Sequence, residues 1–349
     1  MHIAIIAITG NGARIGAALQ SGIPQSRLFV IEKHAAGDAL PFSSGVQNLV
    51  DRLWPDYGGF VFIMAAGIVV RTIAPLLQAK DRDPAVVVLD DAGRFAISLL
   101  SGHVGGANAL AKQCAELTGS IAVITTATDV HDLPSFDMLA KEHGWLIDDL
   151  SRVKVLNALL LEGKEIAVVD RGNAVRNYCA GRGVLSFHQD FAQALMSGAN
   201  GQLVVTNRIL PPRHSSERTL VLRPVNLVLG IGCNRGTSAE EIDAVVTANL
   251  ERLSLSIKSV KCVATAKAKD DEAGLLDFVR KSGMEILFFG SEALNGVEVP
   301  SPPSAHALAA IGATGVAEPA ALLASAGGRL LLHKVKDGNV TLAIAEAAG

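Results

Sequence analysis

The sequence predicts an α/β protein built on open, mostly parallel sheets. Short apolar segments rich in Val and Ile alternate with segments of helical periodicity from the first residue onward. These short segments are apolar throughout, as parallel strands covered by helices on both faces are. The chain has 349 residues, enough for two or three domains at roughly 150 residues each. We expect an N-terminal α/β domain over residues 1–134, a variable middle segment and linker over 135–224, and a C-terminal α/β domain over 225–349.

In the N-terminal domain, each apolar run predicts a strand and each amphipathic stretch a helix. The clearest helix is Ala107–Thr118, in which Leu110, Ala111, Cys114 and Leu117 form one apolar stripe. The expected strands are Ile3–Ile8, Leu28–Ile31, Phe60–Met64, Val86–Leu89, Phe95–Leu99 and Ile121–Thr125.

The middle segment continues this pattern less regularly. A helix is expected at Ser151–Leu161. The polar segment Leu210–Thr219 contains paired prolines and predicts either an interdomain linker or a hairpin loop. The strands expected here are Ile166–Val169, Val184–Phe187 and Leu203–Thr206.

The C-terminal domain begins with a strand at Leu227–Ile231, followed by a glycine loop and a helix over residues 239–253. Ser238 and Glu241 have the spacing of a capping box at the start of this helix. Near the end of the chain, Leu330–Val335 and Val340–Ala345 flank an Asp-Gly pair, which predicts a β-hairpin.

Composition excludes several classes of function. The net charge is −3 and aromatic residues are 4% of the chain, so there is neither a basic face nor a base-stacking platform for nucleic acid. The uncharged stretches are shorter than the ~20 apolar residues of a membrane span, or are interrupted by proline and glycine. The four cysteines form no CxxC pair, which indicates a reducing compartment and no structural zinc site. We therefore expect a cytoplasmic protein that binds neither membrane nor metal.

The first glycine loop, Gly10–Gly16, follows the first strand, and Glu32 ends the second. The arrangement is similar to a dinucleotide-binding fingerprint, but the spacing is GxGxxxG rather than GxGxxG. An ordinary strand-to-helix turn explains the glycines at least as well. An NAD(P)-dependent oxidoreductase is therefore a remote alternative.

The second glycine loop, Ser101–Asn108, precedes the clearest helix. Gly102, Gly105 and Gly106 free the backbone, so that several N–H groups can converge on a carboxylate, a phosphate or an oxyanion. His103 in this loop can act as a general base or acid. The alternative is a tight turn with an exposed histidine. We favour a functional loop, because it follows a strand that we expect to be parallel, and open α/β sheets bind ligands at the carboxyl ends of their strands.

The third glycine loop, Gly230–Ser238, also lies between a strand and a helix. Arg235 together with backbone N–H groups suits another anion. Cys233 near a helix N-terminus has the position of a nucleophile, but no histidine neighbours it in sequence. We favour a small buried residue at this position.

Other charged candidates are weaker, because each has an ordinary structural explanation. Arg71, Asp90 and Arg94 flank two strands and suit a surface β-turn. Lys269 and Glu272 suit a solvated helix start, and Glu318 complements a helix dipole. These candidates are Arg71, Asp90, Arg94, Lys269, Glu272 and Glu318.

Taken together, these motifs resemble the CbiG family. The first part of the chain is similar to the CbiG N-terminal domain, and the last part to its C-terminal domain, which also occurs alone as CobE. Asn234 and Lys267 depart from the family pattern, so roles at these two positions are in doubt. The N-terminal matches are Ala66–Leu77, Lys80–Val88, Gly93–Phe95, Ser98–Asn108 and Thr125–Asp129. The C-terminal matches are Gly230–Ser238, Ala264–Thr265, Lys269, Glu272, Gly315–Glu318, Ala320–Leu323, Lys334 and Val340–Ile344.

The resemblance implies a reaction and a substrate. The δ-lactone of cobalt-precorrin-5A would be hydrolysed with release of acetaldehyde, giving cobalt-precorrin-5B in anaerobic cobalamin biosynthesis. Cobalt would be carried by the substrate, so no protein cofactor is expected. The implied partners are this cobalt-corrinoid and other enzymes of the pathway. A non-catalytic carrier of corrinoid intermediates is the main alternative.

This chemistry suggests roles for the candidate residues. We expect His103 to activate water or protonate the leaving group, with Glu272 or Glu318 as secondary acid–base candidates. The N–H groups of Gly105 and Gly106 would stabilise the oxyanion or bind a carboxylate. The residues expected to bind substrate are Arg71, Asp90, Arg94, Gly102, Gly105, Gly106, Asn108, Cys233, Arg235 and Lys269.

Overall fold

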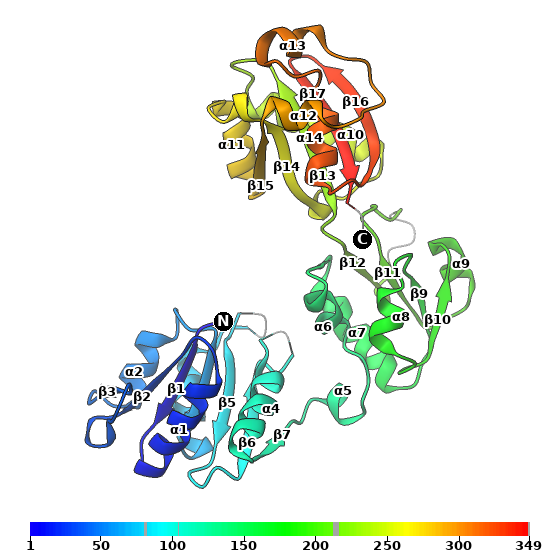
Figure 1. The fold of residues 1–349 in the computed structure, drawn as a ribbon. Helices are drawn as coiled ribbons and strands as arrows, with labels where there is room; N and C mark the ends of the chain where they lie inside the picture. Colours follow the sequence, from blue (N-terminus) through cyan, green and yellow to red (C-terminus); the bar gives the residue numbers. More distant parts are fainter. Residues whose placement is uncertain (80–81, 104, 212–215, 348–349) are drawn as a thin grey trace. The chain divides into compact units, whose positions relative to one another are not determined.

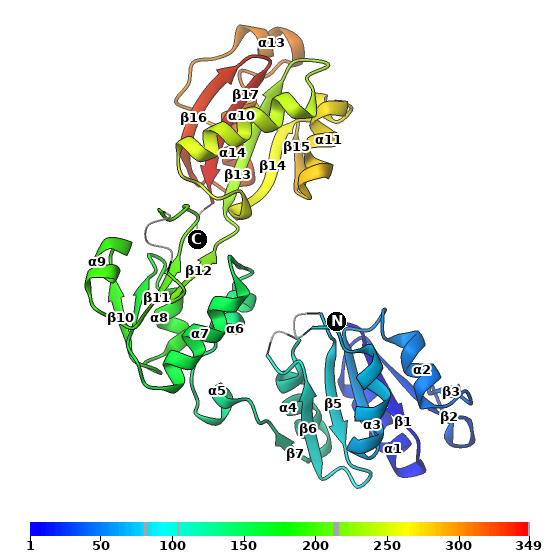
Figure 2. The same ribbon diagram turned by 180° about the vertical axis from the view of Figure 1, so that it is seen from behind.

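Three mostly parallel β-sheets organise the residues that the structure, a computed structural model, describes: 1–79, 82–103, 105–211 and 216–347. The chain divides into two compact units, Met1–Met138 and Leu139–Gly349. The first unit contains one sheet and the second contains two (Figures 1 and 2). This mixed α/β architecture confirms the predicted fold class. Part of the proline-containing segment Leu210–Thr219 and Val104 of the second glycine loop lie outside the described residues.

The first unit contains a seven-stranded sheet in the order β3-β2-β1-β4-β5-β6-β7. Helices α1 and α4 cover one face, and α2 and α3 cover the other. The strands are β1 (Ile3–Ala7), β2 (Ser26–Ile31), β3 (Leu40–Phe42), β4 (Gly59–Ile63), β5 (Ala85–Leu89), β6 (Phe95–Leu100) and β7 (Ile121–Val123). The helices are α1 (Gly10–Gly22), α2 (Val46–Leu53), α3 (Ala66–Ile73), α4 (Ala107–Thr118) and α5 (Ala127–Val130).

One strand of this sheet reverses direction. β6 pairs antiparallel with β5, whereas β7 pairs parallel with β6. Only the short turn from Asp90 to Arg94 separates β5 from β6, which is too short for the crossover that parallel neighbours require. The expectation that the strand before the second glycine loop is parallel to the strand preceding it is therefore wrong, and this reversal decides where His103 lies.

The glycines of the first loop serve helix packing. A Cβ added at Gly16 would lie 2.5 Å from Leu28 Cδ1, and one at Gly12 would lie 3.2 Å from the side chains of Ala7 and Ile63. α1 therefore approaches the sheet too closely for a larger residue at Gly16. This contact accounts for the glycine spacing as an ordinary strand-to-helix turn, the reading we weighed against dinucleotide binding.

The second unit begins with a five-stranded sheet in the order β10-β9-β11-β12-β8. β11 and β12 are parallel neighbours in this sheet, so both expectations for Leu210–Thr219 are wrong. A hairpin loop would make the two strands antiparallel, and an interdomain linker would not join two strands of one sheet. The strands are β8 (Leu146–Ile147), β9 (Ile166–Val169), β10 (Leu185–His188), β11 (Gly201–Val205) and β12 (Thr219–Arg223). The helices near them in sequence are α6 (Phe136–Glu142), α7 (Leu150–Leu161), α8 (Ala174–Cys179) and α9 (Phe191–Met196).

The third sheet has the order β15-β14-β13-β17-β16. Helices α10 and α11 cover one face and α14 the other (Figures 1 and 2). The predicted hairpin is confirmed, since β16 and β17 pair antiparallel. The strands are β13 (Leu227–Cys233), β14 (Val260–Ala266), β15 (Glu285–Phe289), β16 (Arg329–Asp337) and β17 (Val340–Glu346). The helices are α10 (Ala239–Arg252), α11 (Ala273–Ser282), α12 (Ser291–Asn295), α13 (Ala305–Ile311) and α14 (Ala317–Ala324).

Half of the expected capping box forms at α10. Ser238 Oγ accepts a hydrogen bond from the Glu241 N–H at 3.2 Å. The Glu241 carboxylate instead accepts from the Asn339 N–H at 2.9 Å. It thus ties the β16–β17 turn to the helix start. In none of the described helices is there an apolar stretch long enough to span a membrane.

An ion pair in the second unit is expected to make its stability depend on pH. Partial burial raises the pKa of Asp148, but hydrogen bonds and charge from Arg223, and then from Lys258, outweigh it, so the pKa lies below its ordinary value. Such a carboxylate stabilises the fold above its unfolded pKa of about 3.9, and this contribution is lost as the pH falls through the lower folded pKa. At neutral pH, Asp148→Asn should lower the free energy of unfolding by about 2 kcal/mol.

Urea denaturation of wild type and Asp148→Asn between about pH 3 and pH 7 measures the difference in their free energies of unfolding. The range extends below pH 4 because the folded pKa of Asp148 lies below the ordinary value near 4. The difference between wild type and variant should shrink toward the acid end. Asp243→Asn removes an exposed carboxylate on α10 and should leave the pH profile unchanged. A difference for Asp148→Asn that stays constant with pH would contradict the prediction.

Candidate functional site

His103 lies in the loop between β6 and α4, at one edge of the first sheet. Because β6 is antiparallel to β5, its carboxyl end lies beside the amino ends of β1, β4 and β5. β7 runs parallel to β6, so the residues that follow β7 reach the same edge. The loop therefore follows a strand's carboxyl end as expected, but it lies opposite the edge where β1, β4 and β5 end.

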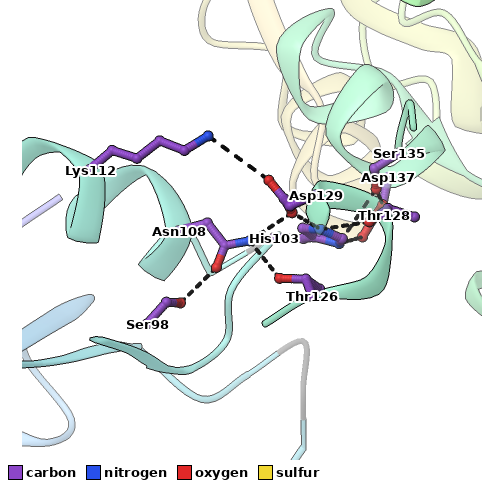
Figure 3. Close-up of polar contacts among 9 residues, drawn as sticks. All are labelled: Ser98, His103, Asn108, Lys112, Thr126, Thr128, Asp129, Ser135 and Asp137. Carbon is purple, nitrogen blue, oxygen red and sulfur yellow. Dashed lines mark hydrogen bonds and ion pairs between the residues drawn. The ribbon is translucent and has the colours of Figure 1, made fainter. Parts of the chain in front are cut away.

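The His103 imidazole is buried between two carboxylates (Figure 3). The side chain is 8% exposed. Nε2 lies 2.8 Å from Asp129 Oδ2 and 3.2 Å from Thr128 Oγ1. Nδ1 has only longer contacts, 3.5 Å to Ser135 Oγ and 3.8 Å to Asp137 Oδ2. One ring nitrogen is thus held closely and the other loosely. The alternative of a tight turn with an exposed histidine is wrong.

Asn108 connects the start of α4 to this cluster (Figure 3). Its Oδ1 accepts a hydrogen bond from Ser98 Oγ at 2.6 Å. Its Nδ2 donates to Thr126 Oγ1 at 2.8 Å and to Asp129 Oδ2 at 3.0 Å. Asp129 Oδ2 therefore contacts both Asn108 and His103. Asn108 positions the carboxylate that holds the imidazole, so it lies in the site without being free to bind a ligand.

The glycines of this loop are needed for its compact path. A Cβ at Gly102 would lie 2.7 Å from Asn108 Oδ1, and one at Gly105 would lie 2.3 Å from Ser101 Cβ. Gly106 has a φ of 93°, a conformation that glycine adopts without strain. The Gly106 N–H donates to the His103 carbonyl at 2.9 Å. It is thus already engaged, contrary to its expected role as an oxyanion donor.

Ser135 and Asp129 lie on opposite sides of the His103 imidazole, as the serine and the aspartate of a nucleophilic triad do. The hydrogen bonds do not support such a triad. The Ser135 hydroxyl donates to Asp137 Oδ1. A serine activated by histidine would direct its hydrogen to the imidazole instead. The arrangement therefore favours proton transfer by the histidine itself over attack by Ser135.

The same cluster is not arranged as a metal site. Asp129 and Asp137 contact opposite nitrogens of the imidazole, so the three side chains do not converge on one point. Over the described ranges, no group of three or more His, Cys, Asp or Glu side chains could hold a metal ion.

Asp90 and Arg94 lie at the other edge of this sheet, in the turn between β5 and β6. Asp90 Oδ1 accepts hydrogen bonds from the N–H groups of Arg94 and Phe95 at 2.7 and 2.8 Å. The Arg94 side chain is 74% exposed. A strand as long as β6 separates this turn from His103, so the structure does not bring them together. Arg71 is exposed in the last turn of α3.

Cys233, Arg235 and Lys269 line one cavity in the second unit. Burial raises the pKa of the Cys233 thiol, and its side chain packs against the core of the third sheet. Cys233 is half-buried rather than fully buried, and its raised thiol pKa disfavours the nucleophile role. Arg235 pairs with the exposed Asp271 at 2.6 Å.

The two glutamates considered as secondary acid–base groups are buried and already bonded. Glu272 accepts a hydrogen bond from the Gly236 N–H at 2.8 Å and lies 3.4 Å from the Lys269 ammonium. Glu318 accepts from Ser301 Oγ at 2.8 Å and from the Lys334 N–H at 2.9 Å. Both carboxylates hold loops of the second unit in place. Their geometry supports a structural role more than proton transfer at the His103 cluster, which belongs to the first unit.

Sequence analysis missed the carboxylates beside His103. Asp129 and Asp137 follow His103 by 26 and 34 positions, and no spacing rule joins them to a histidine. The sequence does contain one indication of this arrangement: only five residues separate β5 from β6. That separation predicts a hairpin, hence a reversed β6 and a shared edge for the ends of β6 and β7.

Comparison with known proteins covers nearly the whole chain. Three family models match in order: "Cobalamin synthesis G N-terminal" over residues 48–129, "Cobalamin biosynthesis central region" over 134–224, and "Cobalamin synthesis G C-terminus" over 227–345. A crystal structure of CobE, a protein from the cobalamin (vitamin B12) biosynthetic pathway, is 33% identical. It covers 35% of this chain and 91% of its own, with a TM-score of 0.33.

Two relatives match from end to end. A cobalt-precorrin-5A hydrolase from Priestia megaterium is 38% identical over 98% of this chain and 94% of its own length. A cobalt-precorrin-5A hydrolase from Salmonella typhimurium is 32% identical over 99% of this chain and 97% of its own. The N-terminal match contains both His103 and Asp129. With its three models in order and full-length relatives at this identity, the chain belongs to the CbiG family.

Proposed function

We propose that this chain hydrolyses cobalt-precorrin-5A, opening its δ-lactone and releasing acetaldehyde to give cobalt-precorrin-5B. The observation that carries the proposal is the 38% identity to a cobalt-precorrin-5A hydrolase over 98% of this chain. A shared fold alone would not support an activity. Here the similarity extends over all three family regions, including the loop with His103.

His103 is the acid–base group of this proposal. Asp129 holds Nε2 at 2.8 Å, which fixes the orientation of the ring, as a carboxylate does for a catalytic histidine. Nδ1 has contacts of 3.5 Å and longer, so these are the contacts that can be exchanged for water or substrate. Hydrogen bonds that are long in the free enzyme commonly shorten once substrate is bound.

Lactone opening then requires one water and one proton relay. His103 takes a proton from water as the oxygen attacks the lactone carbonyl, and the charge moves to the carbonyl oxygen. The acyl C–O bond breaks when the carbonyl re-forms, and His103 returns the proton to the departing oxygen. The opened lactone leaves a hydroxyethyl group on the macrocycle. Its hydroxyl loses a proton as the C=O bond of acetaldehyde forms, the C–C bond to the macrocycle breaks, and the electron pair of that bond passes to the conjugated ring. The Gly105 N–H remains a candidate donor to the oxyanion, whereas the Gly106 N–H is engaged.

The substrate supplies the cobalt, so the proposal assigns the protein no cofactor of its own. The exposed Arg71 is available to a carboxylate of the macrocycle, whereas Arg94 lies at the opposite edge of the sheet from His103. All four cysteines are free, which supports a reducing, cytoplasmic setting. Other enzymes of the same pathway are the expected partners for substrate delivery and product transfer.

Acetaldehyde formation tests the proposal directly. The purified full chain is incubated with cobalt-precorrin-5A under anaerobic conditions, and acetaldehyde is measured through NADH oxidation by alcohol dehydrogenase. We expect one acetaldehyde for each lactone opened. Tetrapyrrole binding without acetaldehyde would instead support the carrier alternative. If neither acetaldehyde release nor tetrapyrrole binding is detected, both functions are refuted.

A further inference from the structure

A cavity of about 760 Å³ lies at one edge of the third sheet. Its floor comes from the carboxyl ends of β13 and β14, at Cys233 and Ala266, and from the start of β17 at Thr341. In open α/β sheets, ligands bind at this edge. The volume falls within the range of small-molecule sites. The cavity lies wholly within the second unit.

The lining of this cavity is cationic. It contains Arg235, Lys269, Lys334 and Lys336, together with His306, and no Asp or Glu is among the described lining residues. Two of the cations already have carboxylate partners outside the lining: Arg235 pairs with Asp271, and Lys269 with Glu272. The cavity therefore presents more positive than negative charge to a ligand.

The two lysines of β16 supply the charge that is not neutralised. The Lys334 ammonium donates to the Pro302 carbonyl at 3.1 Å, and among the described residues neither it nor Lys336 has a carboxylate partner. Both side chains line the cavity. Two neighbouring ammonium groups suit a ligand with more than one carboxylate.

Part of the lining is apolar. It is formed by Pro302 and Pro303 and by Ala307, Ala310 and Ile311 on and around α13. An apolar surface beside several cations fits a flat ring system that carries charged groups on its periphery. A small inorganic anion would leave this surface in contact with water.

We propose that this cavity binds the peripheral carboxylates of a tetrapyrrole macrocycle, with Lys334 and Lys336 as the principal ionic contacts. That the macrocycle is the cobalt-precorrin substrate rests on the proposed function. Ring edges bearing acetate and propionate groups lie against the lysines, and the ring face lies against the prolines. Arg235 adds a further contact at the rim by exchanging Asp271 for a ligand carboxylate.

The experiment compares two double variants of the full chain. Lys334→Gln with Lys336→Gln removes the two ammonium groups of the cavity and keeps polar side chains. Lys261→Gln with Lys281→Gln removes two exposed lysines of the same sheet region, outside the cavity lining. Net charge changes equally in both. Thermal unfolding is recorded for each, so that an effect on binding is separated from an effect on folding.

Binding is measured with uroporphyrin III, a water-soluble tetrapyrrole polycarboxylate, by its absorbance and fluorescence. For the cavity variant we expect Kd to rise about tenfold, because each solvent-accessible ion pair contributes a factor of a few. Added salt should weaken binding to the wild type more than to the cavity variant. The control variant should behave as wild type.

Three outcomes would overturn the inference: no binding of the probe to wild type, the same Kd for wild type and cavity variant, or an equal loss in the control variant. Failure of the proposed function has a different signature. If the cavity variant loses binding as expected but wild type releases no acetaldehyde, the cavity assignment stands and the hydrolase assignment does not.

Discussion

Replacing His103 with asparagine is expected to lower kcat for acetaldehyde release from cobalt-precorrin-5A by about a hundredfold or more, the usual loss when a general acid–base group is removed. Asparagine keeps a hydrogen-bonding side chain beside Asp129 and Asp137, so the cluster is not left with two carboxylates facing a void. It cannot transfer a proton near neutral pH. The measurement is the steady-state rate over a range of pH.

His131→Asn is the matched control, because His131 is an exposed histidine of the same unit. It should leave the rate unchanged. Circular dichroism and thermal unfolding show whether His103→Asn is folded. Asp129→Asn provides a second test that does not alter the imidazole: it should lower kcat, because the ring loses the carboxylate that orients it. If folded His103→Asn turns over substrate as wild type does, the acid–base assignment is wrong.

Gly230→Ala is expected to destabilise the C-terminal sheet by about 3 kcal/mol or more, the upper range for overpacking a core. Gly230 lies in the buried strand β13, where a Cβ would lie 1.9 Å from the Ala317 carbonyl oxygen and 2.8 Å from Ala321 Cβ. The oxygen belongs to the first residue of α14, so relief requires the helix to move away from the sheet. Urea denaturation followed by circular dichroism measures the loss.

Gly232→Ala provides the control within the same strand. A Cβ there would have its nearest neighbour, Val316 Cβ, at 3.6 Å, an ordinary contact. Its unfolding transition should therefore stay within about 1 kcal/mol of wild type, the usual difference between Gly and Ala within a strand. Equal transitions for the two variants would show that α14 does not pack on Gly230 as described.

Local patterns were sufficient to predict most of the strands. Helix α4 has the predicted bounds of Ala107–Thr118, and β9 those of Ile166–Val169. In both cases the signal is the apolar period of a short segment, which depends on neighbours in sequence. The hairpin of β16 and β17 was equally accessible, because an Asp-Gly turn joins its two strands.

The contacts that form the candidate site could not be predicted from the spacing of residues in the sequence. The glycine loop with His103 could be recognised from its composition, but Asp129 and Asp137 reach the imidazole only because β6 is reversed and β7 follows it. Likewise, Arg235 and Lys269 were candidates from their loops. Lys334 and Lys336 joined them only through the pairing of β16 with β17 beside β13.

By itself, the sequence determined the fold class, the positions of most strands along the chain, and the histidine loop. Burial and turn formation, on which these depend, are local properties of the chain. Only the tertiary structure decided which charged groups meet. Strand direction and strand order bring distant residues to a common edge: the carboxylates to His103 in the first sheet, and four cations to one cavity in the third. Both follow from backbone pairing between strands far apart in sequence.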